Sequence, residues 1–279
     1  MISINSLYYH YPKSGMVLSN ISTHFEQGNI YGLFGKNGEG KSTLLKIISG
    51  LLRAKSGEFS VNNENWTHRN APTLEQLFLV PEDFELPKVT IATYEKITGP
   101  FYPNFSRKQF YDLIAEFKLS PKHHIARLSF GQKKKVLIAF GIAVNTSILL
   151  MDEPTNGLDI PSKSQFRKIM ATIADENKCI IISTHQVRDL HSLINHVLVL
   201  DETKVVFDAS LVKVSELFWF GKPKSTEDSA LFTETGFGGK SVMARGDKDE
   251  TEVDLELLFS AVLMENTAIN TMLKNSTHV

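Results

Sequence analysis

The sequence has very little cysteine, almost no net charge and no long apolar run, and each absence excludes a class of protein. Cys179 is the only cysteine in 279 residues, which argues against a disulfide framework, and its apolar neighbours favour a buried thiol over a redox or metal role. Lys and Arg total 30 against 31 Asp and Glu, so no overall field steers the chain onto nucleic acid or an anionic bilayer. The longest apolar stretch, residues 136–144, is far short of the ~20 residues that span a bilayer. We therefore expect a cytoplasmic protein that binds anions only at local sites.

What is present is typical of a folded α/β protein. The apolar share is 42% and the charged share 22%, both ordinary for globular domains. Continuous apolar strands alternate with helical segments, including expected helices over 162–174 and 187–194, which predicts a mostly parallel sheet covered on both faces. Residues 83–145 read as a helical insert, with helices expected from Thr90, from Ser106 with a capping-box pattern, and near Ser129.

The C-terminal part differs from the rest in composition. Residues 221–254 are polar and punctuated by glycine. They precede an amphipathic segment whose apolar face would consist of Leu255, Leu258, Phe259 and Val262. We expect a nucleotide-binding domain over 1–220 and an appendage over 221–279. The apolar face of its helix is expected either to join two C-termini or to dock on the preceding domain.

A glycine-rich loop carries the strongest chemical signal. Residues 35–42, GKNGEGKS, follow a strand-like run and precede a helical pattern, as the G-x-x-x-x-G-K-[ST] motif requires. Glycines let successive backbone N–H groups point into one concavity, and a helix N-terminus adds positive potential. Lys41 adds a full charge and Ser42 a hydroxyl for Mg²⁺. This pattern predicts a triphosphate site.

Two carboxylates end a buried strand further along the chain. Asp152 and Glu153 follow the apolar run ILLM, at the carboxyl end of a strand, where ligands of open α/β sheets gather. Asp152 is suited to hold hydrated Mg²⁺, and Glu153 to orient and deprotonate an attacking water. The alternative, two solvated acids, loses weight beside the phosphate loop.

These motifs, in this order, resemble the ATP-binding cassette (ABC) ATPases over residues 1–215. The resemblance also rests on the signature LSFGQ (128–132), the D-loop NGLD (156–159) and His185 after Ser183 and Thr184. It implies a P-loop NTPase fold with a mostly parallel core sheet, an N-terminal antiparallel β subdomain and a helical insert. It further implies ATP and Mg²⁺ as cofactors and two cassettes facing head to tail, so that Ser129 and Gly131 of one contact the γ-phosphate held by the other.

The resemblance also assigns site residues. Glu153, His185 and Lys41 would be catalytic, and Ser42, Asp152 and Glu82 would serve the metal. An aromatic that stacks on adenine is expected before the phosphate loop, which fits Tyr11, with Tyr9 as the alternate. The other implied nucleotide contacts are Gly35, Asn37, Gly38, Gly40, Lys41, Ser42, Thr43, Ser129, Gly131, Gln132 and Asp159.

Three positions depart from the family pattern. Phe130 replaces the first signature glycine, so its ring is expected to point away from the nucleotide. Glu82 stands where a glutamine is usual, and is either a metal or water ligand or a solvated loop acid. Residues 133–135 are three lysines, read as a solvated face, or alternatively as a patch facing phosphate or a permease.

The resulting functional expectation is the ATPase subunit of an ABC transporter. It would homodimerise on ATP and drive a separate integral membrane permease, peripherally at the inner face of the membrane. The chain also resembles the single-cassette subunits that work with exporter-type (ABC-2) permeases, in YGLFG before the phosphate loop, in FYPNFS in the insert and in the short appendage. This finer resemblance implies an exporter. The insert would form the coupling surface, and the aromatic rings from Phe101 to Phe105 would either be exposed there or close the insert's own small core. One alternative is a soluble ABC ATPase that acts on ribosomes or nucleic acid, although we expect no nucleic acid partner. The other is a catalytically silent cassette.

Overall fold

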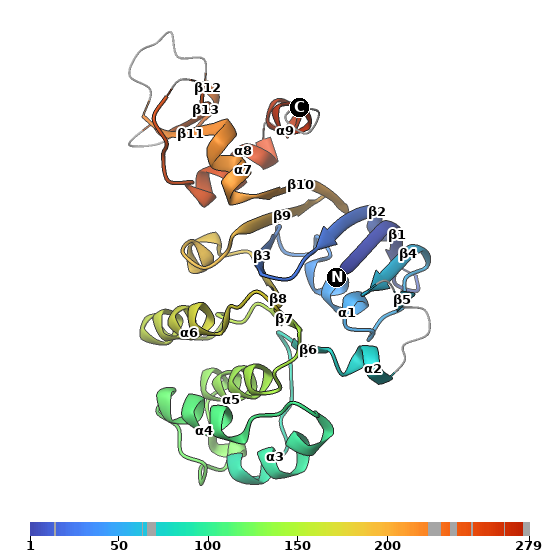
Figure 1. The fold of residues 1–279 in the computed structure, drawn as a ribbon, viewed down its shortest axis with the longest axis vertical. Helices are drawn as coiled ribbons and strands as arrows, with labels where there is room; N and C mark the ends of the chain where they lie inside the picture. Colours follow the sequence, from blue (N-terminus) through green and yellow to red (C-terminus); the bar gives the residue numbers. More distant parts are fainter. Residues whose placement is uncertain are drawn as a thin grey trace.

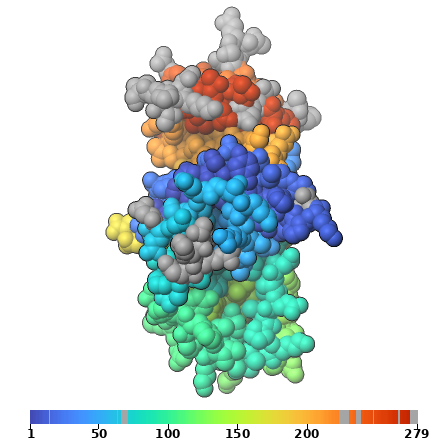
Figure 2. Space-filling view, turned by 90° about the vertical axis from the view of Figure 1, so that its right-hand side faces the viewer, coloured from blue at the N-terminus to red at the C-terminus, as the bar shows by residue number. Residues whose placement is uncertain are grey.

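The chain is arranged in three tiers, with the helical insert at the bottom of Figure 1, two sheets in the middle and the appendage at the top. The computed structural model describes residues 1–13, 15–62, 64–65, 71–222, 230–234, 239–246, 248–264 and 266–275. Figure 2 shows the same order on another face, with the N-terminal part between the appendage and the insert.

The core is a six-stranded sheet in the order β10-β9-β3-β8-β7-β6, parallel except for β10. Its inner strands are buried almost throughout, which explains their continuous apolar sequences. Cys179 begins one of them and is fully buried, as expected, and burial raises the pKa of its thiol to about 12. The strands are β3 (Asn29–Phe34), β6 (Leu77–Val80), β7 (Ile148–Asp152), β8 (Cys179–Thr184), β9 (His196–Asp201) and β10 (Lys204–Ser210).

An antiparallel sheet beside the core confirms the expected N-terminal β subdomain. Its strands, in the order β2-β1-β4-β5, are β1 (Ile2–His10), β2 (Met16–Phe25), β4 (Ser56–Val61) and β5 (Glu64–Asn65). Helix α1 (Lys41–Ile48) packs between the two sheets, with Leu44, Leu45 and Ile48 fully buried. The short α2 (Ala71–Leu74) leads into β6.

The helical insert is built as the sequence predicts. It contains α3 (Ile91–Thr98), η2 (Gly99–Phe101), α4 (Arg107–Glu116), η3 (Ile125–Arg127) and α5 (Phe130–Ala143). Thr90, Ser106 and Ser129 cap its three α-helices by accepting a backbone N–H three residues on. The reciprocal capping box forms at Ser129 rather than at Ser106, because the side chain of Gln109 instead accepts a bond from Asn145.

Aromatic packing divides the stretch from Phe101 to Phe105 between the two expected arrangements. Phe101 is 77% exposed, but Tyr102 and Phe105 are partly buried, with ring centroids 5.8 Å and 5.1 Å from that of Phe140. The two rings are drawn inward because Phe140 lies on α5, which is buried from residue 136 onward. Only Phe101 therefore presents a large apolar surface here.

After the insert the strand and helix alternation resumes with α6 (Ile160–Ile173), but the helix expected over 187–194 is wrong. The segment forms only the 3-10 turn η4 (Val187–Leu190). The chain then bends so that Asn195 accepts a hydrogen bond from Ile30 of β3, 2.9 Å away. The apolar spacing of residues 187–194 arises because an irregular segment is buried, with Leu190 and Ile194 in the core.

The appendage shares the core of the cassette. Its strands β13 (Ser241–Ala244) and β12 (Ala230–Thr233) extend a sheet that begins with β11 (Phe218–Gly221), the strand after α7 (Leu211–Leu217). Helices α8 (Leu255–Met264) and α9 (Asn266–Asn275) follow. Leu255, Leu258 and Val262 are buried in the chain's main hydrophobic cluster, and Phe259 packs on Phe34 with ring centroids 6.1 Å apart. The apolar face therefore docks on the preceding domain. The division at residue 220, which falls inside β11, stays a prediction.

None of the helices in the described ranges has both the length and the apolar composition of a bilayer-crossing segment.

Candidate nucleotide site

A pocket of about 600 Å³ gathers most of the predicted site residues. It lies where β3 and β7 end and α1 begins, so the phosphate loop and the strand-end carboxylates meet as the sequence predicts. Its lining residues are Tyr11, Val17, Asn37, Gly38, Gly40, Lys41, Ser42, Thr43, Glu82, Glu153, Asn156 and His185.

The phosphate loop wraps around the ammonium of Lys41. That group donates to the carbonyls of Gly35 at 2.7 Å and Lys36 at 3.0 Å. Burial lowers the pKa of Lys41, while the nearby carboxylates of Glu153 and Asp152 oppose this shift. The lysine is thus held at the centre of the loop, beside the two acids.

Gly40 shows why this turn needs glycine. Its φ is +92°, and a Cβ there would lie 2.8 Å from Leu18 Cδ2 and 3.0 Å from the carbonyl oxygen of Val17. Gly40 is also the N-cap of α1 and has no side chain to occupy the helix end. The first N–H groups of α1 therefore face the pocket, as phosphate binding requires.

The two carboxylates at the end of β7 are buried and held by the next strand. Asp152 is 3% exposed and accepts from the Ser183 hydroxyl at 2.5 Å. Glu153 is 4% exposed and accepts from the Thr184 hydroxyl at 3.0 Å. Ser183 and Thr184 were named in the sequence only as the residues before His185, although two hydroxyls that end a buried strand are a usable signal for such contacts.

Glu153 and His185 form a pair inside the pocket. His185 Nδ1 lies 2.8 Å from Glu153 Oε1, and the backbone N–H of His185 donates to the same oxygen at 3.0 Å. Glu153 has a φ of +43°, an uncommon conformation for a residue with a side chain. This conformation accompanies the turn of the chain out of β7, where Glu153 N–H bonds to the Ser183 carbonyl at 3.1 Å.

A second polar network supports the turn after His185, and sequence reasoning missed it. Asp189 is 8% exposed and accepts from the Thr155 hydroxyl and from the Lys163 ammonium, each at 2.7 Å. Lys163 also donates to Gln186 at 2.8 Å. These bonds fasten the segment after His185 to Thr155, which precedes the D-loop, and to Lys163 of α6.

Tyr11, rather than Tyr9, lines the pocket. The Tyr11 hydroxyl lies 3.1 Å from that of Thr43, while Tyr9 is 5% exposed and packs edge-on against Tyr11. The arrangement favours Tyr11 as the aromatic available to an adenine ring. Its role stays a prediction.

The expected metal ligands fit a hard divalent cation. Ser42 and Glu82 line the pocket, and Asp152 lies behind it next to Ser183. Glu82 is oriented by Asn156, whose side-chain amide donates to it at 3.0 Å. Hydroxyl and carboxylate oxygens are the ligands that Mg²⁺ takes alongside substrate phosphates. Mg²⁺ held here would neutralise charge on those phosphates.

The signature residues lie apart from this pocket. Ser129, Gly131, Gln132 and Asp159 are not among its lining residues in the described part of the chain. Ser129 and Gln132 instead form the capping box at the start of α5, and Asp159 caps α6. A Cβ on Gly131 would lie 2.6 Å from the Gly157 carbonyl oxygen, so the signature touches the D-loop of its own chain.

The residues that depart from the family pattern also have definite contacts. The Phe130 ring packs against Phe84, with centroids 5.4 Å apart, and closely approaches Gly157. Its direction relative to a bound nucleotide stays a prediction. The solvated face expected at 133–135 is wrong for Lys134, which is fully buried because its ammonium bonds to backbone carbonyls, whereas Lys133 and Lys135 are partly exposed.

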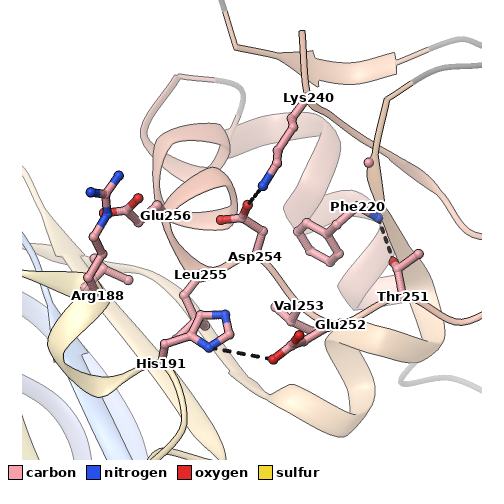
Figure 3. A pocket seen from close by; sticks show the side chains of 12 residues that line it. Arg188, His191, Phe220, Lys240, Thr251, Glu252, Val253, Asp254, Leu255 and Glu256 are labelled. Atoms are coloured by element: carbon pink, nitrogen blue, oxygen red, sulfur yellow. Dashed lines mark hydrogen bonds and ion pairs between the residues drawn. The ribbon is translucent and has the colours of Figure 1, made fainter. Parts of the chain in front are cut away.

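A second hollow of similar size lies between η4 and the appendage. Figure 3 shows charged side chains around it that already pair with one another. Arg188 bonds Glu256 at 2.6 Å, Lys240 bonds Asp254 at 2.7 Å, and His191 lies 3.8 Å from Glu252. The Arg188 and His191 pairs join the appendage to the segment that follows His185, whereas the Lys240 pair lies within the appendage.

Comparison with known proteins agrees with this geometry. Residues 18–156 match the family described as "ABC transporter". The chain is 30% identical, over 219 residues, to the energy-coupling factor transporter ATP-binding protein EcfA of Methanococcus maripaludis, covering 74% of this chain and 78% of that protein. It is 29% identical to EcfA2 of Staphylococcus aureus, covering 71% of this chain and 74% of that protein.

Solved structures show the same fold. The ATP-binding subunit of an ABC transporter superposes with a TM-score of 0.69 at 24% identity, covering 76% of this chain and 91% of that one. A dimeric bacterial ABC transporter cassette gives a TM-score of 0.67 at 22% identity, covering 76% and 99%.

The fold and the pocket define a P-loop ATPase of the cassette type. The chain belongs to the ABC transporter ATP-binding proteins, a family of ATPases that use ATP with Mg²⁺.

Proposed function

We propose that this protein is an ABC ATPase that dimerises on ATP and powers a separate membrane permease. One observation carries the dimer: the phosphate loop, Glu153 and His185 share one pocket, whereas Ser129 and Gly131 lie outside it. The capped start of α5 presents N–H groups and a hydroxyl, which suit it to bind a phosphate. In a head-to-tail dimer, that phosphate would belong to the nucleotide held by the other chain.

Each residue then has a distinct task. Lys41 and the first N–H groups of α1 bind the phosphates, and Ser42, Asp152 and Glu82 hold the metal. Glu153 accepts a proton from the attacking water, and its bonds to Thr184 and His185 keep its carboxylate in place. Buried and fixed acceptors need little reorganisation during reaction.

An exposed apolar groove marks the side on which we place the permease. It runs between the core and the insert, and its walls include Leu51, Leu74 and Phe101, which are 66%, 38% and 77% exposed. Large apolar side chains gathered on a surface are typical of a protein contact. The groove touches the insert, through which a permease would sense closure of the dimer.

The direction we propose is export. The support is the sequence resemblance in YGLFG, FYPNFS and the short appendage. The relatives that match are named for energy-coupling factor transporters, which supports a membrane partner for this chain and leaves direction to experiment. ATP-dependent accumulation of substrate inside inverted membrane vesicles supports export, whereas accumulation in right-side-out vesicles overturns it.

The permease contact is tested by Phe101→Ala, with Val212→Ala as the matched control. Val212 is 66% exposed on α7, away from the groove. Phe101→Ala should keep basal ATPase activity and lose co-purification with the permease, because a central aromatic anchor contributes ~2 kcal/mol or more to binding. The control should retain both. Equal permease binding by the two variants, or wild-type protein that co-sediments with ribosomes and binds no permease, would contradict the proposal.

A further inference from the structure

Lys134 is a fully buried lysine on the signature helix that no step above uses. Its exposed fraction is 0%, although it sits between two lysines that reach solvent. A buried ammonium is costly unless hydrogen bonds replace its water. The contacts that replace it here come from two other parts of the site.

The ammonium joins α5 to both sides of the metal position. It donates to the backbone carbonyls of Pro81 at 3.0 Å, Glu82 at 3.3 Å and Asp152 at 3.4 Å. The Phe84 ring lies over it at 5.4 Å. Glu82 and Asp152 are two of the three residues assigned to the metal, and Lys134 bonds to the backbone of each.

The same loop is braced from a second direction. Phe130, one turn before Lys134 on α5, packs against Phe84, and Asn156 of the D-loop donates to the carboxylate of Glu82. The 81–84 loop is therefore held by the signature helix through a charge and a ring, and by the D-loop through an amide. Burial lowers the pKa of Lys134 to about 8, and nearby carboxylates oppose this shift because they favour the charged form.

We propose that Lys134 is a positioning residue for ATP hydrolysis, because it fixes the backbone of Glu82 and Asp152 so that both carboxylates meet one Mg²⁺ while the signature helix is docked. The proposal rests on the metal roles given above. Lys134 does not line the nucleotide pocket. It acts as an outer partner of two ligands, and loss of such partners typically reduces metal affinity or activity 10- to 100-fold.

The test compares Lys134→Met with Lys134→Gln and with the control Lys133→Met. Methionine keeps the length and removes the donors, glutamine keeps a neutral donor, and position 133 is the half-buried neighbour on the same helix. In Lys134→Met we expect kcat to fall and the Mg²⁺ concentration for half-maximal activity to rise, each by ~10-fold or more. Lys134→Gln should recover part of both losses, and Lys133→Met should match wild type.

Two readouts besides turnover separate positioning from folding. ATP affinity without divalent metal should stay within about threefold of wild type, because the phosphate loop is untouched, while Mn²⁺ affinity of the ATP complex, measured by electron paramagnetic resonance, should fall ~10-fold. Hydrogen exchange of residues 81–84 should quicken. Unchanged metal dependence in Lys134→Met overturns the proposal. So does parallel loss of ATP binding and melting temperature in both Lys134 variants, since that outcome assigns a purely structural role.

A variant of the proposed metal ligand Asp152 tests the metal site separately from the role of Lys134. If the wild type hydrolyses ATP but Asp152→Asn leaves its metal dependence unchanged, the proposed metal site fails. If Asp152→Asn raises the metal concentration needed for activity and Lys134→Met leaves it unchanged, only the positioning role fails.

Discussion

At the scale of single residues, the general base that we propose is Glu153, which is buried and bonded to Thr184 and His185. Glu153→Gln keeps size and hydrogen-bonding capacity but cannot accept the proton. We expect hydrolysis to fall by roughly 10²- to 10⁴-fold while ATP binding survives. The variant should then accumulate as an ATP-dependent dimer, measured by size exclusion and steady-state phosphate release.

Lys41→Ala supplies the contrast at the same pocket. It removes the charge held between the Gly35 and Lys36 carbonyls, so neither binding nor dimer nor turnover should remain. Hydrolysis at the wild-type rate in Glu153→Gln would overturn the choice of base. Dimer formation on ATP by Lys41→Ala would contradict the composite site.

Residue positions fixed by local motifs could be predicted, whereas those set by contacts between distant parts of the chain could not. Lys41 follows from a loop of eight residues whose spacing alone places it beside the phosphates. Lys134 appears in the sequence as one charge in a run of three, because its partners are backbone carbonyls of residues far away in the chain. Every residue has a backbone carbonyl, so the residue type does not show which carbonyls accept a hydrogen bond from a distant side chain.

At the scale of elements, the approach of α5 to the D-loop leaves no room for a side chain at Gly131. Gly131→Ala would place Cβ 2.6 Å from the Gly157 carbonyl oxygen. We expect destabilisation of ~1–3 kcal/mol, the usual range for overpacking. ATP-dependent dimerisation should weaken, measured in the Glu153→Gln background, because the start of the signature helix must shift.

Gly15→Ala is the matched control, since its Cβ would meet no atom within 4 Å. It should change neither melting temperature nor dimer fraction. If Gly131→Ala behaves like this control, the close approach does not constrain the signature.

Elements were predicted well where their ends are marked locally. Thr90, Ser106 and Ser129 begin helices because a short polar side chain satisfies a free backbone N–H, and that bond spans only three residues. The segment 187–194 has helical apolar spacing but forms only a four-residue turn at its start. The chain then leaves the helical path because Asn195 hydrogen-bonds to β3. The spacing of apolar residues indicates which residues are buried, but tertiary contacts decide which path the backbone takes.

At the scale of the whole molecule, the appendage acts as part of the core. Leu258 is 1% exposed in the cluster shared with the cassette. Leu258→Ala should destabilise the protein by about 2–5 kcal/mol, with a lower melting temperature by calorimetry. The nucleotide-free oligomeric state should stay unchanged by light scattering, because this face is already covered within one chain.

Met264→Ala serves as the control on the same helix, where the side chain is 73% exposed, and it should leave melting unchanged. Conversion from dimer to monomer by Leu258→Ala, with no loss of stability, would assign the face to contact between chains instead.

The packing of Phe259 on Phe34 also bears on how the protein is made. Phe34 ends the strand that leads into the phosphate loop, and the ring that covers it is encoded more than two hundred residues later. At a synthesis rate of ~5–20 residues per second, the ribosome needs roughly 10 to 40 s to reach the covering helix. During that interval the nascent protein presents an apolar face that a chaperone can bind, so α8, made late in synthesis, covers a part of the core that is made early.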